Sequence, residues 1–148
     1  MRSVDVALYT DAAGGGGIGA VAFTREGGGV VRRTWCGVVG SDTVSRLSEG
    51  SSEIYALETY AVLASLRALG QVFTTRGGKI MAYVDNNATL AALTRGASRA
   101  RAVNTIVRDI WTLVADNDWF VWWERVPTEV NPADHPSRTG RQPGWGTL

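Results

Sequence analysis

The sequence is poor in several residue types and patterns, and these absences narrow the class of protein. Its 148 residues include one cysteine, Cys36, which can form no disulfide within the chain, so a reducing, intracellular setting is expected. No apolar run approaches the roughly 20 residues that span a bilayer, and residues 1–11 lack the apolar stretch of a signal peptide. No block of like charges marks a disordered tail. We therefore expect a monomeric globular domain with a sizeable core and no membrane partner.

Lysine is almost absent as well. Lys79 is the only lysine among 15 basic residues, the rest being arginines, and the formal net charge is only +1. The planar guanidinium fork of arginine suits phosphate binding, but a base composition that favours arginine codons would give the same imbalance. The basic residues alone therefore leave nucleic-acid binding open.

Glycine, by contrast, is abundant and separates three predicted strands. Residues 4–11 alternate apolar and polar side chains, and residues 18–26 and 30–39 are two further strand-like segments. Glycine runs at 14–17 and 27–29 lie between them, which predicts an antiparallel meander with short turns. The first run resembles a phosphate-binding loop only superficially, because it leads into a strand and lacks the Lys-Ser or Lys-Thr ending of such loops.

The clearest helix runs from Ser51 or Ser52, either of which can cap it, to Gly70. Glu58 falls within its apolar face, whereas Glu53 on the first turn is expected to be exposed. A carboxylate directed at a core is unfavourable unless it is paired or holds a metal, so Glu58 is a candidate functional residue. The apolar face at helical spacing consists of Ile54, Leu57, Ala61, Val62, Leu66 and Leu69.

A nearly continuous apolar strand, residues 80–84, is followed at once by Asp85 and another helix. Such strands are typical of sheets buried on both faces, and open α/β sheets place their sites at the carboxyl ends of strands. Asp85 could cap the next helix, but Asn86 could do so equally well and leave Asp85 free.

The remaining pattern completes a single domain. An amphipathic helix is predicted over residues 98–117 and a tryptophan-rich strand over 119–127, which gives the order β-β-β-α-β-α-α-β-α. We expect one domain over residues 1–140 and a flexible tail over 141–148.

The last informative segment places Asp134 between Pro132 and Pro136, beside His135, the only histidine. Proline fixes φ, so Pro132 suits the first turn of a short helix with Asn131 as its cap. Taken alone, the segment predicts a capped helix whose acid merely favours the positive end of the helix dipole.

Four acids on this plan nevertheless suggest a common site. Asp11 ends the first strand, and if strand 80–84 lies beside it, Asp85 meets Asp11 while helices bring in Glu58 and Asp134. Carboxylates so close raise one another's pKa unless divalent cations neutralise them. Mg²⁺ and Mn²⁺ prefer such oxygen ligands. Two ions about 3.5–4 Å apart can clamp the attacking and leaving oxygens of a phosphoryl displacement.

Four segments carry a resemblance to a known family. "YTDAA" in the first strand, "LETYAVLASL" in the first long helix, "YVDNNATLAAL" after the fourth strand and "VPTEVNPADHPSR" near the end are similar, in this order, to the ribonuclease H domain family. The sequence most resembles such domains of retroelement reverse transcriptases, particularly Pao-like and DIRS-like elements, which typically end with an N-x-A-D-x-x-S-R signature. The resemblance implies an α/β, ribonuclease H-like fold: a five-stranded mixed sheet, three antiparallel strands then parallel crossovers, with helices on both faces.

The resemblance also implies an activity. The carboxylates of Asp11, Glu58, Asp85 and Asp134 would hold two Mg²⁺ ions, for which Mn²⁺ can substitute, and Asp11 would be shared by both ions. The reaction would be endonucleolytic hydrolysis of the RNA strand of RNA–DNA hybrids, leaving 5′-phosphate and 3′-hydroxyl ends. A groove would read hybrid shape and 2′-hydroxyls rather than sequence. A reverse transcriptase polymerase domain in the parent polypeptide is a second expected partner. The candidate substrate contacts are Asn87, Arg95, Arg99 and Arg138.

Two departures from the family pattern matter. Many members have a mobile histidine shortly before the last aspartate, where this chain has Trp-Glu-Arg at residues 123–125. His135 is thus either a substitute proton shuttle or a surface residue. No basic handle helix is inserted between the helix that follows Asp85 and the helix over residues 98–117. Arg95, Arg99 and Arg101 are therefore either part of a phosphate-binding surface or residues of a solvated loop and helix start.

Two rival functions use the same fold. One is a catalytically silent nucleic-acid-binding or assembly module, against which the presence of all four acids argues. The other is a DNA nuclease of the exonuclease or resolvase type. Glu58 in the first long helix and the Asn-Pro-Ala-Asp ending favour ribonuclease H over this second rival.

Overall fold

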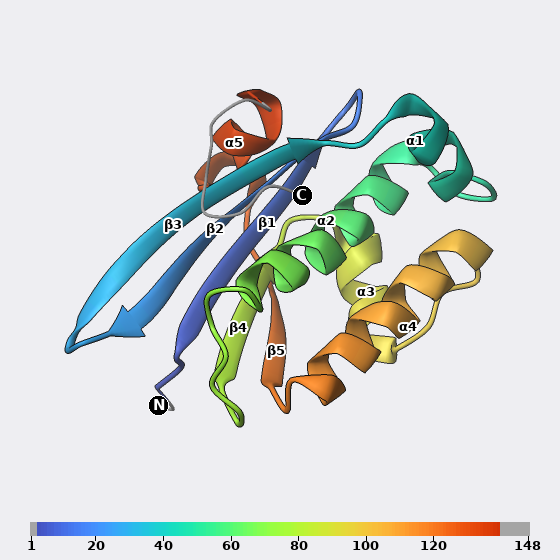
Figure 1. Ribbon diagram of the computed structural model, residues 1–148. Helices are drawn as coiled ribbons and strands as arrows, with labels where there is room; N and C mark the ends of the chain where they lie inside the picture. The colour runs from blue at the N-terminus through green and yellow to red at the C-terminus, as the bar shows by residue number, and fades with distance from the viewer. Residues whose placement is uncertain (1–2, 140–148) are drawn as a thin grey trace.

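The protein forms a five-stranded mixed sheet with the strand order β3-β2-β1-β4-β5. The computed structural model describes residues 3–139. Strands β1, β2 and β3 pair antiparallel, whereas β4 is parallel to both β1 and β5 (Figure 1). This confirms the predicted sheet. Its strands are β1 (Val6–Ala13), β2 (Gly17–Glu26), β3 (Gly29–Val38), β4 (Lys79–Val84) and β5 (Phe120–Arg125).

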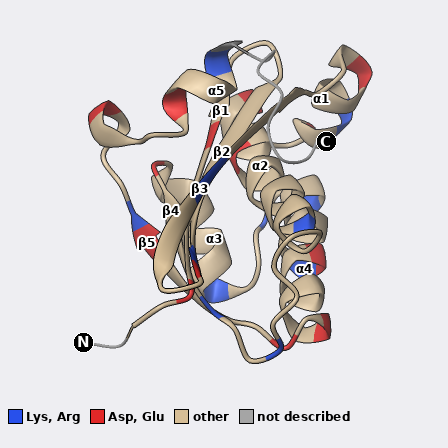
Figure 2. Cartoon of the chain, turned by 60° about the vertical axis from the view of Figure 1, so that its left-hand side comes forward, with Lys and Arg blue, Asp and Glu red and all other residues tan. Residues whose placement is uncertain are grey.

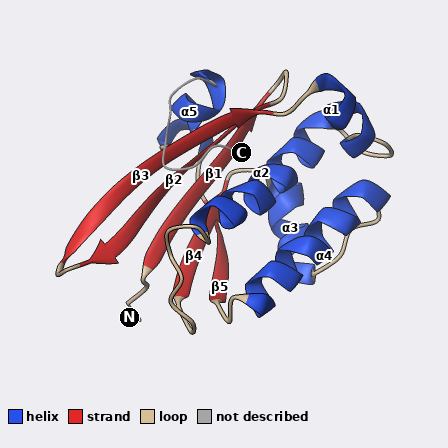
Figure 3. Cartoon of the chain, viewed as in Figure 1, coloured by secondary structure: helices blue, strands red, loops and turns tan. Residues whose placement is uncertain are grey.

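Helices lie on both faces of the sheet, as predicted. α2, α3 and α4 lie on one side, whereas the short α5 lies on the other and contacts β1, β2 and β3 (Figures 2 and 3). Both α2 and α5 contact β1, so residues of β1 can meet side chains from either helix. The helices are α1 (Ser41–Leu47), α2 (Glu53–Leu69), α3 (Asn87–Arg95), α4 (Arg101–Asp116) and α5 (Asp134–Thr139), with a 3₁₀ turn η1 (Thr128–Val130) before α5.

The apolar core fills the space between the sheet and the α2–α4 layer. Removal of this apolar surface from water is the main force that holds the two layers together. Every second residue of the central strands takes part, as the period of a strand requires. Side chains of the core with no exposed surface include Val6, Leu8, Leu57, Leu66, Ile80, Val84 and Ile110.

The opposite face of the sheet is covered less completely. The residues of β4 alternate between buried and half-buried, whereas its continuous apolar sequence predicted burial on both faces. On the half-buried face the rings of Tyr9 and Tyr83 stack with centroids 4.5 Å apart, and Phe23 meets Tyr9 edge-on. The apolar character of β4 on this side therefore serves an aromatic cluster rather than a second helical layer.

Two local features differ from the sequence prediction. α1 is absent from the predicted order. It has seven residues, no side-chain cap at Gly40 and a single buried residue, Val44, so it lacks the cap and the apolar periodicity that identify longer helices. Ile54, expected on the buried face of α2, is 41% exposed. It lies in the first turn of that helix, and continuous burial begins only at Ala56.

Two further expectations were the absence of a membrane-spanning segment and a flexible C-terminal tail. Within residues 3–139, no helix combines the length and the apolarity that crossing a bilayer requires. The tail expected over residues 141–148 lies outside the described residues.

Candidate metal centre

The register between β1 and β4 brings two of the predicted acids to one edge of the sheet. The strands are parallel, and their last aligned pair is Tyr9 with Tyr83. Asp11 and Asp85 each follow two residues later, so the same register carries both to the carboxyl end of the strand pair. β4 ends at Val84, which places Asp85 just beyond the strand.

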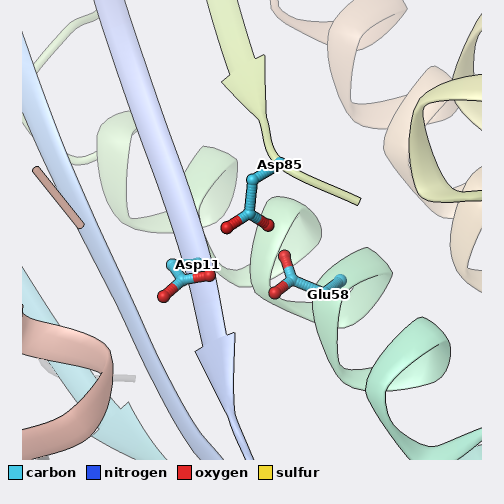
Figure 4. Close-up of side chains that lie close together, drawn as sticks. All are labelled: Asp11, Glu58 and Asp85. Atoms are coloured by element: carbon cyan, nitrogen blue, oxygen red, sulfur yellow. The ribbon is translucent and has the colours of Figure 1, made fainter. Parts of the chain in front are cut away.

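Asn86 leaves the Asp85 carboxylate free. The side chain of Asn86 accepts a hydrogen bond from the backbone N–H of Thr89, 2.9 Å away, and so caps α3. Of the two capping residues that the sequence allowed, the structure therefore uses Asn86. Asp85 is half-buried, and its carboxylate is directed toward Asp11 and Glu58 (Figure 4).

Glu58 reaches the same point from α2. Ser52 caps this helix by accepting a hydrogen bond from the N–H of Tyr55, 3.2 Å away. Glu58 is only 3% exposed, and its Oε1 accepts a hydrogen bond from the N–H of Ala12 at 3.1 Å. Its other oxygen, Oε2, is buried and has no hydrogen-bond partner among the described residues. A buried carboxylate oxygen in this state is unfavourable unless a proton or a cation joins it.

The three carboxylates form one cluster between β1, β4 and α2. Oxygens of Asp11, Glu58 and Asp85 lie within 4.8 Å of one another (Figure 4). Burial, and then the charges of Asp11 and Asp85, raise the pKa of Glu58 to about 10. Burial also raises the pKa of Asp11 to about 6. A hydrogen bond with the Glu58 carboxyl and, more weakly, one from Ser137 oppose this shift, whereas the charge of Asp85 adds to it. Without a cation, the cluster therefore retains a proton at neutral pH.

This donor set fits a hard divalent cation. It consists of carboxylate oxygens, which Mg²⁺ and Mn²⁺ prefer, and within residues 3–139 no histidine or cysteine joins it. Oε2 of Glu58 accepts no hydrogen bond from the described residues, although the Glu58 carboxyl interacts with that of Asp11. A cation at this point would also offset the mutual repulsion that raises the pKa of Glu58.

Asp134 stands apart from the three clustered carboxylates. Within residues 3–139 it is not among the acids that lie within 4.8 Å of one another. It opens α5, and its Oδ1 accepts a hydrogen bond from Nε of Arg138 at 3.0 Å, an exposed ion pair one helical turn long. Its connection to the cluster runs through Ser137, whose hydroxyl lies 2.9 Å from Oδ2 of Asp11.

The predicted substrate contacts and the candidate proton shuttle all lie at the surface. Asn87 opens α3, two residues beyond Asp85, and is exposed. Arg95 ends α3 and Arg99 lies in the connection to α4; both are exposed and line a cavity of about 270 Å³. His135 is an exposed residue of α5. Their contacts with nucleic acid stay predictions, as does that of Arg138, which the structure pairs with Asp134.

Sequence reasoning missed two contacts that hold α5. Asn131 was expected only as a cap, and it does accept a hydrogen bond from the N–H of Ala133 at 3.0 Å. It also donates through Nδ2 to the carbonyl of Thr10, 3.0 Å away, and so ties this segment to β1. The helix begins at Asp134 rather than at Pro132. Residues 132–133 form a turn instead, which the N–H of Asp134 closes by donating to the carbonyl of Asn131 at 3.1 Å. The second contact is that of Ser137 with Asp11. The only sign of it in the sequence is a serine one helical turn after Asp134.

Comparison with solved structures identifies the fold as that of ribonuclease H. The N-terminal RNase H domain of Rv2228c from Mycobacterium tuberculosis, solved as a fusion with maltose-binding protein, matches with a TM-score of 0.64 at 18% identity, over 93% of this chain and 94% of that chain. RNase H1 from the halophilic archaeon Halobacterium salinarum NRC-1 matches with a TM-score of 0.65 at 18% identity, over 91% and 94% of the two chains.

A third ribonuclease gives the same result. LC11-RNase H1, isolated from compost by a metagenomic approach, matches with a TM-score of 0.65 at 17% identity, over 90% of this chain and 93% of that chain. No protein-family model matches the sequence, and no curated protein matches it either. The likeness to these proteins therefore lies in the fold, and the function has to be inferred from the residues of the site.

Proposed function

We propose that this protein is a metal-dependent endoribonuclease that hydrolyses the RNA strand of RNA–DNA hybrids. The observation that carries the proposal is the convergence of Asp11, Glu58 and Asp85, with a buried Glu58 oxygen that lacks a partner among the described residues. The fold supports the substrate class, since the matched solved structures are RNase H proteins.

The four acids together would bind two divalent ions, Mg²⁺ or Mn²⁺. Such ions, when bound, supply charge stabilisation and an activated water for in-line displacement at phosphorus. Asp11, between α2 and α5, would contribute to both ions, Glu58 and Asp85 to one, and Asp134 to the other. Asp134 would exchange its Arg138 partner for a cation, and exposed ion pairs of this kind are weak. In-line attack with the 3′ oxygen as leaving group gives 5′-phosphate and 3′-hydroxyl ends.

The hybrid would lie across the surface that leads from α3 toward α4. Asn87 at the start of α3 would face the minor groove, and Arg95 and Arg99 would contact phosphates. The short connection that carries Arg99 is held in place, because the hydroxyls of Tyr55 and Ser98 lie 2.8 Å apart. A fixed connection with exposed Arg99, next to exposed Arg95 at the end of α3, supports this role in a chain that has no handle insertion.

The test is cleavage of end-labelled RNA–DNA hybrid, duplex DNA and duplex RNA with Mg²⁺, with Mn²⁺ and with a chelator. We expect the hybrid alone to be cut, only with a cation, and Asp11→Asn and Asp85→Asn to abolish cutting. Asp109→Asn, at an exposed position of α4, is the matched control and should cut normally.

Each other result has a definite meaning. No cation-dependent cleavage of any substrate by the parent protein would overturn the enzyme assignment. Binding of hybrid without cleavage would indicate a silent nucleic-acid-binding module, and preferred cleavage of duplex DNA would indicate a DNA nuclease.

We also propose that the domain belongs to a reverse transcriptase of the Pao-like or DIRS-like retroelement type. Support comes from the signature residues near the end, since Asn131, Ser137 and Arg138 each make a side-chain contact that holds β1, Asp11 or Asp134. An antibody against the domain should detect a native polypeptide much larger than 15.8 kDa that also has polymerase activity. A native polypeptide of the domain's own mass would contradict this assignment.

A further inference from the structure

The hydroxyl of Ser137 lies between the first and the last of the four acids. Ser137 is 1% exposed, and its Oγ is 2.9 Å from Oδ2 of Asp11 and 2.8 Å from the backbone carbonyl oxygen of Asp134. A hydroxyl has a single hydrogen to donate. An ionised carboxylate is a stronger acceptor than a carbonyl, whereas a bond to a carbonyl one turn earlier is common for serine in helices. The hydrogen of Ser137 is therefore directed to Asp11 whenever that carboxylate is charged.

Two glycines of β2 allow α5 to come close enough for this contact. A Cβ atom on Gly19 would lie 2.5 Å from the backbone nitrogen of Ser137, and one on Gly17 would lie 2.2 Å from its carbonyl oxygen. Any side chain at either position would push the helix away from the strand. Gly19 is also the cross-strand partner of Asp11. The strand residue beside the acid therefore provides the space in which the hydroxyl reaches it.

A second hydrogen bond holds the same segment. Asn131 is 5% exposed and donates to the carbonyl of Thr10, the residue before Asp11. α5 is thus attached on both sides of Asp134: Asn131 precedes the acid and Ser137 follows it. Of these two bonds only that of Ser137 reaches a carboxylate of the cluster.

We propose that Ser137 is a positioning residue of the metal centre: its hydrogen bond fixes the orientation of the Asp11 carboxylate and sets the spacing between Asp134 and the Asp11–Glu58–Asp85 cluster. The inference rests on the proposed function, in that these acids hold divalent cations. Removal of the hydroxyl leaves every ligand in place but frees Asp11 to rotate and α5 to shift. Groups that hold metal ligands in this way typically contribute about 10- to 100-fold to metal affinity or activity.

The experiment compares Ser137→Ala with Ser65→Ala. Ser65 is an equally buried serine whose hydroxyl donates to a backbone carbonyl of α2, that of Ala61. Mn²⁺ affinity is measured by calorimetry without nucleic acid, and thermal unfolding is measured without metal. We expect Ser137→Ala to bind Mn²⁺ about 10-fold more weakly than the parent and Ser65→Ala to bind it normally, with similar melting temperatures for the two variants.

Cleavage supplies a second readout. In Ser137→Ala the Mg²⁺ concentration for half-maximal cleavage of hybrid should rise in parallel with the loss of Mn²⁺ affinity. KM for the hybrid at saturating Mg²⁺ should not change, since Ser137 is buried and does not face the substrate. A general loosening of the fold would instead change KM and the metal-free melting temperature together.

The outcomes separate this inference from the proposed function. Unchanged Mn²⁺ affinity of Ser137→Ala, with or without a lower melting temperature, overturns the positioning role and leaves a packing role. Weaker Mn²⁺ binding by Ser137→Ala in a protein that cuts no hybrid supports the positioning role and overturns the proposed function. A parent protein that does not bind Mn²⁺ overturns both.

Discussion

The two parts of the candidate metal centre are built in different ways. Asp11 and Glu58 stand on a central strand and a long helix and are 4% and 3% exposed; Asp85 follows the adjacent strand. Asp134 stands on a helix of six residues, and its side chain is 36% exposed and paired with Arg138. Core packing holds the first three acids, whereas two hydrogen bonds and two glycines hold the helix of the fourth.

This difference shows where the electrostatic strain of the site resides. The buried acids repel one another and retain a proton until a cation arrives, whereas Asp134 already has a positive partner and is open to solvent. The cluster should therefore dominate cation binding, and Asp134 should adjust what the bound cations do. Substitutions in the two parts should separate these contributions.

Glu58→Gln should have the largest effect. It removes a buried ligand, and loss of several kcal/mol of charge stabilisation corresponds to about a thousandfold slower cleavage. Stability without metal should be unchanged or slightly higher, because glutamine resembles the protonated form that a pKa of about 10 maintains at neutral pH. Single-turnover cleavage and urea unfolding measure the two effects. Glu53→Gln, an exposed position on the same helix, is the control, and similar activity of the two variants would show that Glu58 is no ligand.

Asp134→Asn should slow cleavage by about 10- to 100-fold, or roughly 1.4 to 2.7 kcal/mol, less than Glu58→Gln does, because the cluster still binds a cation. Its melting temperature should change little, since the lost ion pair with Arg138 is exposed. Steady-state cleavage with calorimetry of metal binding tests this, with Glu129→Gln in the exposed 3₁₀ turn as control. An effect as large as that of Glu58→Gln would remove the distinction between the two parts of the site.

The pH dependence of stability should also differ between metal-free and metal-loaded protein. Folding raises the pKa of Asp11 from 3.8 to about 6 and that of Glu58 from 4.5 to about 10, so the folded state binds more protons than the unfolded state between these values. Stability without metal should therefore fall as pH rises from about 4 through neutrality. Differential scanning calorimetry with a chelator should show a melting temperature lower by several degrees at pH 8 than at pH 5, and a smaller difference with Mg²⁺. A metal-free melting temperature that rises over this range would contradict the pKa shifts.

His135→Ala should have the smallest effect. The side chain is exposed, and substitutions at such positions usually change free energies by less than about 0.5 kcal/mol, or roughly twofold. A proton shuttle would instead contribute about a hundredfold or more. Turnover of hybrid at saturating Mg²⁺ decides between the two roles, and His135→Gln serves as a polar control.

Sequence reasoning pointed to members of the acidic cluster where one residue breaks a local pattern. Glu58 interrupts an apolar helix face, and Asp85 follows an apolar strand with a separate cap available, so the type and spacing of neighbouring residues revealed both. Ile54 belonged to the same helical pattern as Glu58 but lies in an exposed first turn, because periodicity does not show how far along a helix the core extends.

The contacts of α5 could not be predicted in this way. The Ser137–Asp11 bond joins residues 126 positions apart, and no local pattern indicates which strand a short helix approaches. Gly17 was assigned to a turn, the commonest place for glycine, whereas Gly17 and Gly19 both lie within β2 and leave room for that helix. α1 was missed for the opposite reason, since it has too few buried residues to produce a pattern.

The distance in sequence between Asp11 and Ser137 has a consequence for synthesis on the ribosome. A chain that grows from its N-terminus can pair β1 with β4 and pack α2, and so assemble the three clustered acids, before α5 has been made. Loop-closure entropy rises only slowly with chain length, so the late contact can still form readily. A nascent chain would therefore present the three clustered acids while still lacking the fourth acid and Ser137, and the proposed nuclease activity would reach its full rate only when the last helix docks.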